Sequence, residues 1–385
     1  MYLCLIILTN KTMAKNNLWT LLLVIFMALT ACTKDGNTIY QTNPDEEKPS
    51  TAPLVTVIYG PNSLGDRSYC DKISMGVEAA AKKYGVRTLQ LSPESEEQGL
   101  AYLEMMFQQM ENATDSVRRL FVIPTTLYDG YIRANNKRLE KNPNADLLYL
   151  ETTTPLDGKG STFYIDYYGA MYMGGCLIHY EASQVAALIL ANPYTESVRE
   201  AGKGFQAGFN DTPQWDEKYP LELHVRYLSE EPEGGFEIAD STAIRIILEE
   251  SHSWFEHYPE WSFAAGGENN LTIVPVCGGA MNPLIRSVLL NSDGGFTFVG
   301  VDRDMAIDWG YCSYSIVKHI DKVMEDYIGQ WLNSTMPKHQ TFGLSDGVTG
   351  IVASDQFTQM FDYYQIDMDS LRQVAIGKEE ERYGK

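Results

Sequence analysis

Residues 54–85 read LVTVIYGPNSLGDRSYCDKISMGVEAAAKKYG and join a strand, a loop and a helix in that order. The apolar, partly β-branched run 54–59 is typical of a buried strand. Apolar residues then recur at helical spacing from Ser68 to Tyr84, and Gly85 predicts the end of this helix. A buried strand followed directly by an amphipathic helix predicts the start of a βαβ unit.

The same alternation continues along the chain. Further strands are expected at 120–123, 147–150, 186–190, 221–228, 271–276 and 296–301, and further helices at 131–140, 169–179, 197–209, 238–257, 282–290 and 314–332, before a tail of one strand and one helix. Strands separated by helices favour parallel sheets. Two such series on either side of a chain reversal at 164–169 predict an α/β protein with two lobes.

The first 32 residues have the pattern of a secretory leader. A basic start at Lys15 precedes an apolar run over 18–31, which is shorter than the about 20 residues that a membrane-spanning helix needs. The ending Leu29-Thr30-Ala31-Cys32 matches the bacterial lipoprotein box, in which the cysteine receives a diacylglycerol. We therefore expect residues 1–32 to be a lipoprotein signal peptide that is translated from Met13.

The polar residues 33–51 follow this leader and predict a flexible tether. The alternative to a lipoprotein leader is a plain transmembrane anchor. With the lipid on Cys32, the protein is expected in the bacterial cell envelope, anchored to a membrane and facing the periplasm or the cell exterior.

Composition limits the classes of partner. The formal net charge is −21, and no basic patch dense enough for nucleic acid is present. The four cysteines beyond the leader, Cys70, Cys176, Cys277 and Cys312, are widely spaced and form no CxxC pair, so no metal site is expected. Buried free thiols are one interpretation, and a single disulfide is the alternative that an exported protein permits.

Enzyme motifs are missing from the sequence. It contains no GxSxG, no P-loop, no HExxH and no dinucleotide fingerprint. Among the scattered histidines only His252 and His257 are close, and a separation of five residues turns them about 140° apart on a helix. We therefore expect a protein that is not an enzyme and has no catalytic residue and no cofactor.

Polar and glycine-rich residues follow five of the strands, where open α/β sheets bind their ligands. These strand ends are 60–68, 124–128, 151–154, 278–279 and 300–304. Asp302 could accept hydrogen bonds from two adjacent hydroxyl groups of a sugar or ribose, although a helix cap is the alternative. The pair Gly278-Gly279 lets a ligand approach backbone amides, or simply forms a tight turn.

Several stretches, in order along most of the chain, resemble the basic membrane protein (BMP) family, the PnrA-like lipoproteins that bind purine nucleosides for ABC importers. The resembling stretches are GDRSYCD (65–71), GVE (76–78), FQAGF (205–209), GG (278–279), GVDRD (300–304), SIVKHID (315–321) and FGLSDG (342–347). The set of matches is specific, although no single piece is.

The resemblance implies a fold and its boundaries. It implies the two-lobed type I periplasmic-binding-protein fold, in which each lobe is a parallel sheet with flanking helices and the ligand cleft lies between the lobes. The N-terminal lobe is expected at 52–165 plus 312–340. The C-terminal lobe is expected at 166–311 plus 341–385.

The resemblance also implies residues that hold the base of a nucleoside. Tyr69 corresponds to the aromatic residue that stacks on the base. Cys70 replaces an asparagine that reads polar atoms of the base, and Glu151 stands for an aspartate after the third strand. The second stacking aromatic of the family is missing, since Val274 stands near its place.

The ribose is implied to lie between Asp302 and Lys318, which match the family's residues for the sugar hydroxyls. Together they would form a charge-assisted clamp, and Gly278 or Gly279 would offer backbone groups. The alternative for Asp302 and Lys318 is a structural salt bridge between lobes.

The function that the resemblance implies is that of a lipid-anchored receptor for a small polar ligand, most specifically a purine nucleoside, that delivers it to an ABC importer. The expected partners are this ligand, membrane lipid through Cys32 and the importer's permease. Two alternatives stay open: a sensor that passes lobe closure to a membrane partner, and a surface lipoprotein that binds a sugar or other small molecule without transport.

Overall fold

The computed structural model describes residues 51–181, 184–214, 220–232, 234–236, 242–247, 249–250, 271–282, 284–285, 296–305 and 312–382. All of them belong to one compact unit, 40–385. The predicted leader, its lipidation site Cys32 and the tether up to residue 50 lie outside the described residues, as do His252 and His257. Of the predicted helices 238–257 and 282–290, the described residues 242–247, 249–250, 282 and 284–285 are helical.

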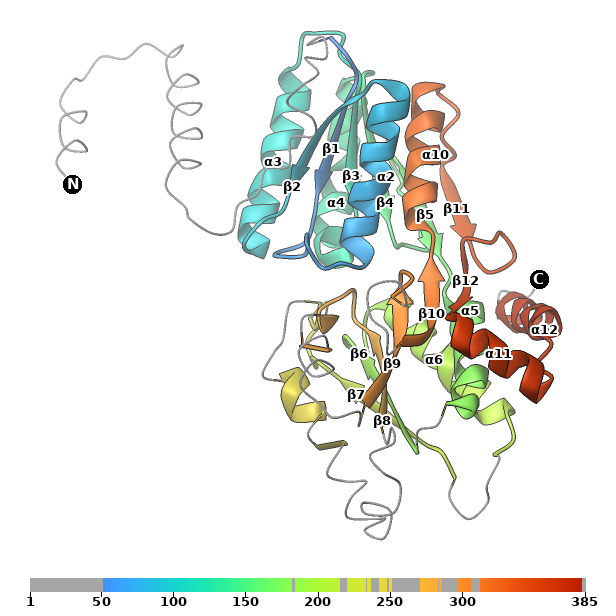
Figure 1. Cartoon of the computed structure of the whole chain (residues 1–385). Helices are drawn as coiled ribbons and strands as arrows, with labels where there is room; N and C mark the ends of the chain where they lie inside the picture. Colours follow the sequence, from blue (N-terminus) through green and yellow to red (C-terminus); the bar gives the residue numbers. More distant parts are fainter. Residues whose placement is uncertain are drawn as a thin grey trace. The chain divides into compact units, whose positions relative to one another are not determined.

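The first sheet has the strand order β11-β5-β4-β3-β1-β2, and all of its paired strands are parallel. Its elements are β1 (Leu54–Ile58), α2 (Tyr69–Tyr84), β2 (Arg87–Leu91), α3 (Glu96–Asn112), β3 (Arg119–Ile123), η2 (Thr126–Tyr128), α4 (Asp129–Asn135), η3 (Asn136–Lys141), β4 (Ala145–Leu150), β5 (Ser161–Ile165), α10 (Ile320–Leu332) and β11 (His339–Phe342). Helices α2 and α10 flank this sheet together with α3 and α4 (Figure 1).

The second sheet has the order β12-β10-β9-β8-β6-β7 and is parallel except for the edge strand β12. Its elements are α5 (Tyr168–Leu177), η4 (Ile178–Tyr180), β6 (Val185–Leu190), α6 (Glu196–Asp211), β7 (Glu222–Tyr227), β8 (Leu271–Val276), β9 (Phe296–Asp302), β10 (Cys312–Lys318), β12 (Thr349–Ala353), α11 (Asp355–Tyr364) and α12 (Met368–Glu381). Five parallel strands thus occupy equivalent places in the two sheets, with β4 matching β9 and β5 matching β10.

Apolar strands with helices on both faces explain the packing of the first lobe. Ile73 and Val77 on α2 are fully buried with Met324 of α10 on one face of the sheet. Leu103 and Phe107 on α3 are fully buried on the other face. Each such side chain stabilises the fold by about 1.5–3 kcal/mol relative to an exposed one.

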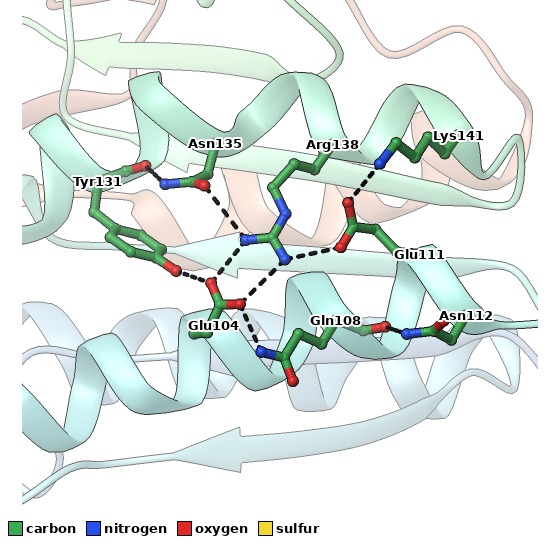
Figure 2. Close-up of polar contacts among 8 residues, drawn as sticks. All are labelled: Glu104, Gln108, Glu111, Asn112, Tyr131, Asn135, Arg138 and Lys141. Carbon is green, nitrogen blue, oxygen red and sulfur yellow. Dashed lines mark hydrogen bonds and ion pairs between the residues drawn. The ribbon is translucent and has the colours of Figure 1, made fainter.

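On the outer side of the first lobe, an ion-pair network joins α3 to η3 (Figure 2). Arg138 donates to Glu104 at 2.7 Å and to Glu111 at 2.9 Å, and Lys141 pairs with Glu111 at 2.8 Å. Tyr131 also donates to Glu104. The charges are therefore shared between two elements that are separate in the chain.

The chain crosses between the sheets three times. Asp166 and Tyr167 connect β5 to α5, His319 connects β10 to α10, and residues 343–348 connect β11 to β12. The predicted reversal at 164–169 is confirmed by the first of these crossovers. The order of elements also confirms the two α/β series.

One predicted helix is wrong over its first part. Residues 314–318 were expected in a helix at 314–332, but they belong to strand β10, and the helix begins at Ile320. The run Ser315-Ile316-Val317 is buried on both faces of a sheet, and a short apolar run of this kind does not distinguish a strand from a buried helix by its periodicity. The tail contains β11, β12, α11 and α12, one strand and one helix more than expected.

The sheets differ from the expected lobe boundaries at two places. Residues 312–318 lie in the second sheet, although they were assigned to the N-terminal lobe, and residues 341–342 lie in the first sheet. The remaining lobe boundaries stay a prediction. Strands β2 and β5 and helix α3 were not anticipated at all. Within the described ranges, no helix has the length and apolar character needed to cross a membrane.

Candidate functional site

A cavity of about 420 Å³ lies where the carboxyl ends of strands from both sheets meet, which is where open α/β sheets bind ligands. Its volume falls in the range of about 300–1,000 Å³ that is usual for small-molecule sites. Its lining comes from the segments after β1 to β5 on one side and after β6 to β10 on the other. Both lobes therefore contribute to one site.

The loop after β1 positions the start of α2 in the cavity wall. The carboxylate of Asp66 accepts hydrogen bonds from the backbone amides of Ser68 at 2.8 Å, Cys70 at 2.9 Å and Asp71 at 3.2 Å. These amides have no partner within the helix, so Asp66 caps its N-terminus. Burial raises the pKa of Asp66 to about 7, while the amide hydrogen bonds oppose this rise.

Tyr69 and Glu151 line the cavity from the first lobe. In the part of the chain that the structure describes, the hydroxyl of Tyr69 and Oε2 of Glu151 are buried and make no hydrogen bond of normal geometry, although the two side chains interact with each other. Burial raises the pKa of Glu151, and the charge of Lys318 opposes this rise. Burial also raises the pKa of Tyr69, and the negative charge of the nearby Glu151 raises it further.

Lys318 ends β10 and is 5% exposed. Its Nζ lies 3.4 Å from Oε1 of Glu151, which makes a salt bridge between the ends of strands in the two sheets. The same Nζ lies 5.5 Å from the ring centroid of Tyr69 and 4.8 Å from that of Tyr167. Cation–π attraction therefore adds to the ion pair in holding this charge at the cavity.

Asp302 is the last residue of β9 and is 6% exposed. Its φ of 70° is one that residues other than glycine seldom adopt. Its Oδ2 accepts a hydrogen bond of 3.1 Å from Oγ of Ser68, across the two lobes. Its backbone amide donates to the hydroxyl of Tyr167 at 3.1 Å. Glu151, at the equivalent strand end of the first sheet, also has a positive φ, 59°.

The expected clamp of Asp302 and Lys318 is differently paired. Both residues line the cavity, but the salt bridge of Lys318 is to Glu151, and Asp302 is bonded by Ser68. The salt bridge that Lys318 forms between the lobes is to Glu151, and not to Asp302 as the alternative had it. The site therefore holds two carboxylates, only one of which faces the lysine directly.

The two glycines after β8 have separate positions. Gly278 (φ 58°) lines the cavity, and a Cβ atom there would lie 3.3 Å from the ring of Phe236. Gly279 (φ 87°) lies against the opposite loop, where a Cβ atom would meet the carbonyl oxygen of Asp66 at 2.5 Å. Of the two, Gly278 is the one in the cavity wall, and Gly279 allows the lobes to touch.

Hydrogen bonds outside the cavity lining also join the two lobes directly. Nδ2 of Asn282 donates to the carbonyl oxygen of Asp66 at 2.8 Å. Oγ1 of Thr153 donates to Glu196 at 3.0 Å. These hydrogen bonds, with that of Ser68 and Asp302, join the loops after β1 and β4 to the second lobe.

Sequence reasoning missed two aromatic residues in the lining, Tyr167 and Phe236. Tyr167 lies in the crossover itself, and its hydroxyl donates to the carbonyl oxygen of Ile316. Phe236 follows Gly234-Gly235 after β7, so an aromatic residue beside two glycines was the only signal for it. Val274 is fully buried, and the cavity lining does not include it.

The four described cysteines are all buried and free, which agrees with the interpretation as free thiols. Cys70 and Cys277 line the cavity. Burial raises the pKa of Cys70 well above its usual value and that of Cys277 to about 12, so both thiols are protonated at neutral pH. In the described ranges, no group of three or more His, Cys, Asp or Glu is placed to hold a metal ion.

No family model matches this sequence, and no curated protein matches it. Solved structures do. A solute-binding protein of an ABC transporter system from Aeropyrum pernix K1 superposes with a TM-score of 0.58 at 13% identity, covering 86% of each chain. The solute-binding protein from Burkholderia graminis C4D1M in complex with D-arabinose gives 0.52 at 15% identity, covering 81% of this chain and 98% of its own.

A third similar structure is a transcriptional activator of the comK gene from Bacillus halodurans. It gives a TM-score of 0.56 at 14% identity and covers 85% of this chain and 96% of its own. At such identities these likenesses concern the fold. The chain has the two-lobed α/β fold of type I periplasmic binding proteins, and the predicted fold class is confirmed.

Proposed function

We propose that this chain is an extracytoplasmic solute-binding protein that takes a small polar ligand, most specifically a purine nucleoside, and delivers it to an ABC importer. The observation that carries the proposal is the cavity between the strand ends of both sheets, lined by Tyr69, Glu151, Asp302 and Lys318. The neighbouring solute-binding proteins of ABC systems support the transport role. Membership of the basic membrane protein family and the lipid anchor on Cys32 are parts of the same proposal.

The chemistry of the cavity suits a nucleoside. The ring of Tyr69 offers a face on which a base can stack, which is worth about 1–3 kcal/mol per base. The free Oε2 of Glu151 accepts a hydrogen bond from an N–H of the base. Asp302 accepts hydrogen bonds from two ribose hydroxyls, and Phe236 supplies an aromatic side chain from the second lobe.

A sugar is the second candidate ligand. The Burkholderia graminis neighbour was solved with D-arabinose, and paired carboxylates beside aromatic rings also suit a pyranose or furanose. The fold by itself does not require transport, since one neighbour is a transcriptional activator. A sensor or a surface lipoprotein that binds a sugar without transport therefore remains the alternative to an importer subunit.

A thermal-shift screen tests the ligand class. Purine and pyrimidine nucleosides, free bases, pentoses and hexoses are added separately to the purified chain without its leader. A ligand at 100 times its Kd raises the free energy of unfolding by about 2.7 kcal/mol. Stabilisation by purine nucleosides and not by sugars supports the proposal, and the reverse result selects the sugar.

Asp302→Ala is the variant that assigns any stabilisation to this cavity. Its matched control is Asp326→Ala, an exposed carboxylate on α10. Loss of the shift in the first variant and not in the control locates the ligand in the cavity. An equal shift in both variants contradicts the proposed site, and no shift with any compound contradicts the ligand classes.

A further inference from the structure

The C-terminal helix α12 contacts two of the three crossovers through one carboxylate. Glu379 is 6% exposed. Its Oε2 accepts a hydrogen bond of 2.8 Å from the amide of Gly169, at the start of α5 just after the first crossover. Its Oε1 accepts one of 2.9 Å from the amide of Leu344, in the crossover between β11 and β12.

A glycine lies where this carboxylate approaches each crossover: Gly169 just after the first one and Gly343 within the third. A Cβ atom at Gly169 would lie 2.6 Å from Oε2 of Glu379, and a Cβ atom at Gly343 would overlap Oε1. Neither glycine has a positive φ, so backbone conformation does not explain their presence. The close approach of Glu379 does.

Two arginines of the same C-terminal segment reach the same crossovers. Arg382 donates to the carboxylate of Asp166 at 3.2 and 3.3 Å, pairs with Glu200 and lies 4.2 Å from the ring centroid of Tyr168. Arg372 donates to the carbonyl oxygen of Leu344 at 2.7 Å. Each crossover is therefore bonded to the C-terminal segment at two points.

The helix that carries these side chains belongs to the second lobe. Ala375 is fully buried in the apolar core of that lobe, and Leu371 and Ile376 pack against it. The second crossover, at His319, is bonded to the first lobe instead. Nζ of Lys72 on α2 donates to the carbonyl oxygen of Lys318, just before this crossover, at 2.7 Å.

We infer that α12 is a hinge clamp, which fastens the first and third crossovers to the second lobe and confines bending to the junctions 165–166 and 342–343. Hinges are a few residues at the ends of elements that absorb changes in φ and ψ, and a helix bonded to two crossovers limits which of their residues can bend. The inference rests on the two-lobed architecture and is independent of the ligand.

The ionisation of Glu379 bears on the clamp. Burial and the negative charge of Asp166 raise the pKa of Glu379 to about 7, while the two amides and Arg382 oppose the rise. The other charged groups at these crossovers are Glu200 and Arg372, with Asp346, which accepts from the amide of Gly343 at 3.0 Å. Protonation makes one of the two oxygens a donor and a weaker acceptor, so one of the two amide hydrogen bonds is weakened.

The test measures the hinge without ligand. Spin labels on Met105→Cys in the first lobe and Tyr363→Cys in the second, both exposed, report the distance between lobes by pulsed EPR. Amide hydrogen exchange at Gly169 and Leu344 reports the two bonds. The variants are Glu379→Gln and Arg382→Gln, and the control is Lys378→Gln, which removes the exposed pair with Asp211 and a cation–π contact with Tyr172 and leaves both crossovers untouched.

We expect Glu379→Gln to raise exchange at Gly169 or Leu344 at least tenfold and to broaden the interlobe distance distribution, with Lys378→Gln unchanged in both. Arg382→Gln should broaden the distribution as well, and it keeps the test open if Glu379→Gln fails to fold. Faster exchange with an unchanged distribution overturns the clamp and leaves α12 a packing helix. Unchanged exchange overturns the bonds themselves.

Discussion

At the scale of single residues, the site gathers acidic groups at equivalent strand ends of the two lobes. Glu151 directly follows β4, and Asp302 is the last residue of β9, the strand that occupies the same place in the second sheet. Both residues have the left-handed φ that is rare outside glycine. Such strain persists where the surroundings hold the residue, and it concentrates at functional sites. Tyr167 lies two residues after β5, and Lys318 is the last residue of the equivalent strand β10. Equivalent strand ends of the two lobes therefore supply these four residues of the cavity wall.

Asp302→Ala should weaken the binding of a nucleoside by about tenfold to a hundredfold, since hydrogen bonds to a charged group contribute about 1.5–3 kcal/mol. Tyr69→Ala should cost a similar amount through the lost stacking face. Calorimetry with the nucleoside that gives the largest thermal shift measures both. Asp302→Ala binding as tightly as the wild type, while folded, would show that this carboxylate serves only Ser68.

Lys72 is a buried residue whose loss should destabilise the fold. Its Nζ lies 3.0 Å from Oδ1 of Asp321 and donates to the carbonyl oxygen of Lys318, and the residue is 8% exposed. Removing one partner of a buried pair costs about 3–5 kcal/mol, and the 26% exposure of the Asp321 side chain places this pair at the lower end of that range. We expect Lys72→Met to lower the free energy of unfolding by about 3 kcal/mol in urea denaturation, with Lys82→Met, an exposed change on the same helix, near zero. Equal effects of the two variants would show that the pair of Lys72 and Asp321 does not stabilise the fold.

At the scale of elements, the network between α3 and η3 predicts acid sensitivity of the first lobe. Hydrogen bonds from Arg138 lower the pKa of Glu104 and of Glu111 to about 2 (Figure 2). A carboxyl whose folded pKa is lowered stabilises the fold above its unfolded pKa, near 4.3, and this contribution disappears as the pH falls toward 2.

Arg138→Gln should therefore reduce the dependence of stability on pH between about 4.3 and 2. Above pH 6 this dependence should change little. Because the side chains of this network are 22–40% exposed, solvent screens the interaction and the change in stability at neutral pH is expected to be small. Chemical denaturation at pH 2.5, 4.5 and 7 measures it. The control is Arg133→Gln, which removes a separate pair with Asp129 and the hydrogen bonds of Arg133 to residues 152–155. The same flattening in the control would argue against the network.

The elements also show where the amino-acid sequence is informative. The strand 54–59 could be predicted because it is a short, continuous apolar run. The helix after it could be predicted because its apolar residues recur at helical spacing and a glycine ends it. Strand β10 could not be separated from α10, since its residues are apolar on both faces and only His319 intervenes. Of the seven residues predicted for the ligand site, all but Gly279 line the cavity, and their role in binding stays a prediction. Phe236 was missed because it lies in a loop after β7 that has no periodic pattern.

At the scale of the whole molecule, several buried ionisable groups control how stability depends on pH. Asp66, Glu181 and Glu379 each have a pKa of about 7, because burial disfavours the charged carboxylate. In the unfolded chain such groups titrate near 4. Between pH 4 and 7 the folded state holds more protons than the unfolded state, so the free energy of unfolding falls as the pH rises through this window.

Buried histidines have the opposite effect. Burial lowers the pKa of His179 and of His319, so below about pH 6.5 the unfolded state binds more protons at these two groups than the folded state does. A single melting curve at each pH therefore reports a sum of opposing contributions. Comparing a variant with the wild type across the same window isolates one carboxyl from that sum.

Glu379→Gln should show a smaller fall in melting temperature between pH 5 and pH 7.5 than the wild type, because glutamine does not titrate. A tenfold difference in proton affinity between the folded and unfolded chain corresponds to about 1.4 kcal/mol of folding free energy. Glu380→Gln changes the adjacent, exposed carboxylate on α12 and should follow the wild-type curve. Differential scanning calorimetry at both pH values measures this. Parallel curves for the wild type and both variants would mean that Glu379 ionises alike in the folded and unfolded chain, and its burial between the two crossovers would then have no energetic effect on protonation.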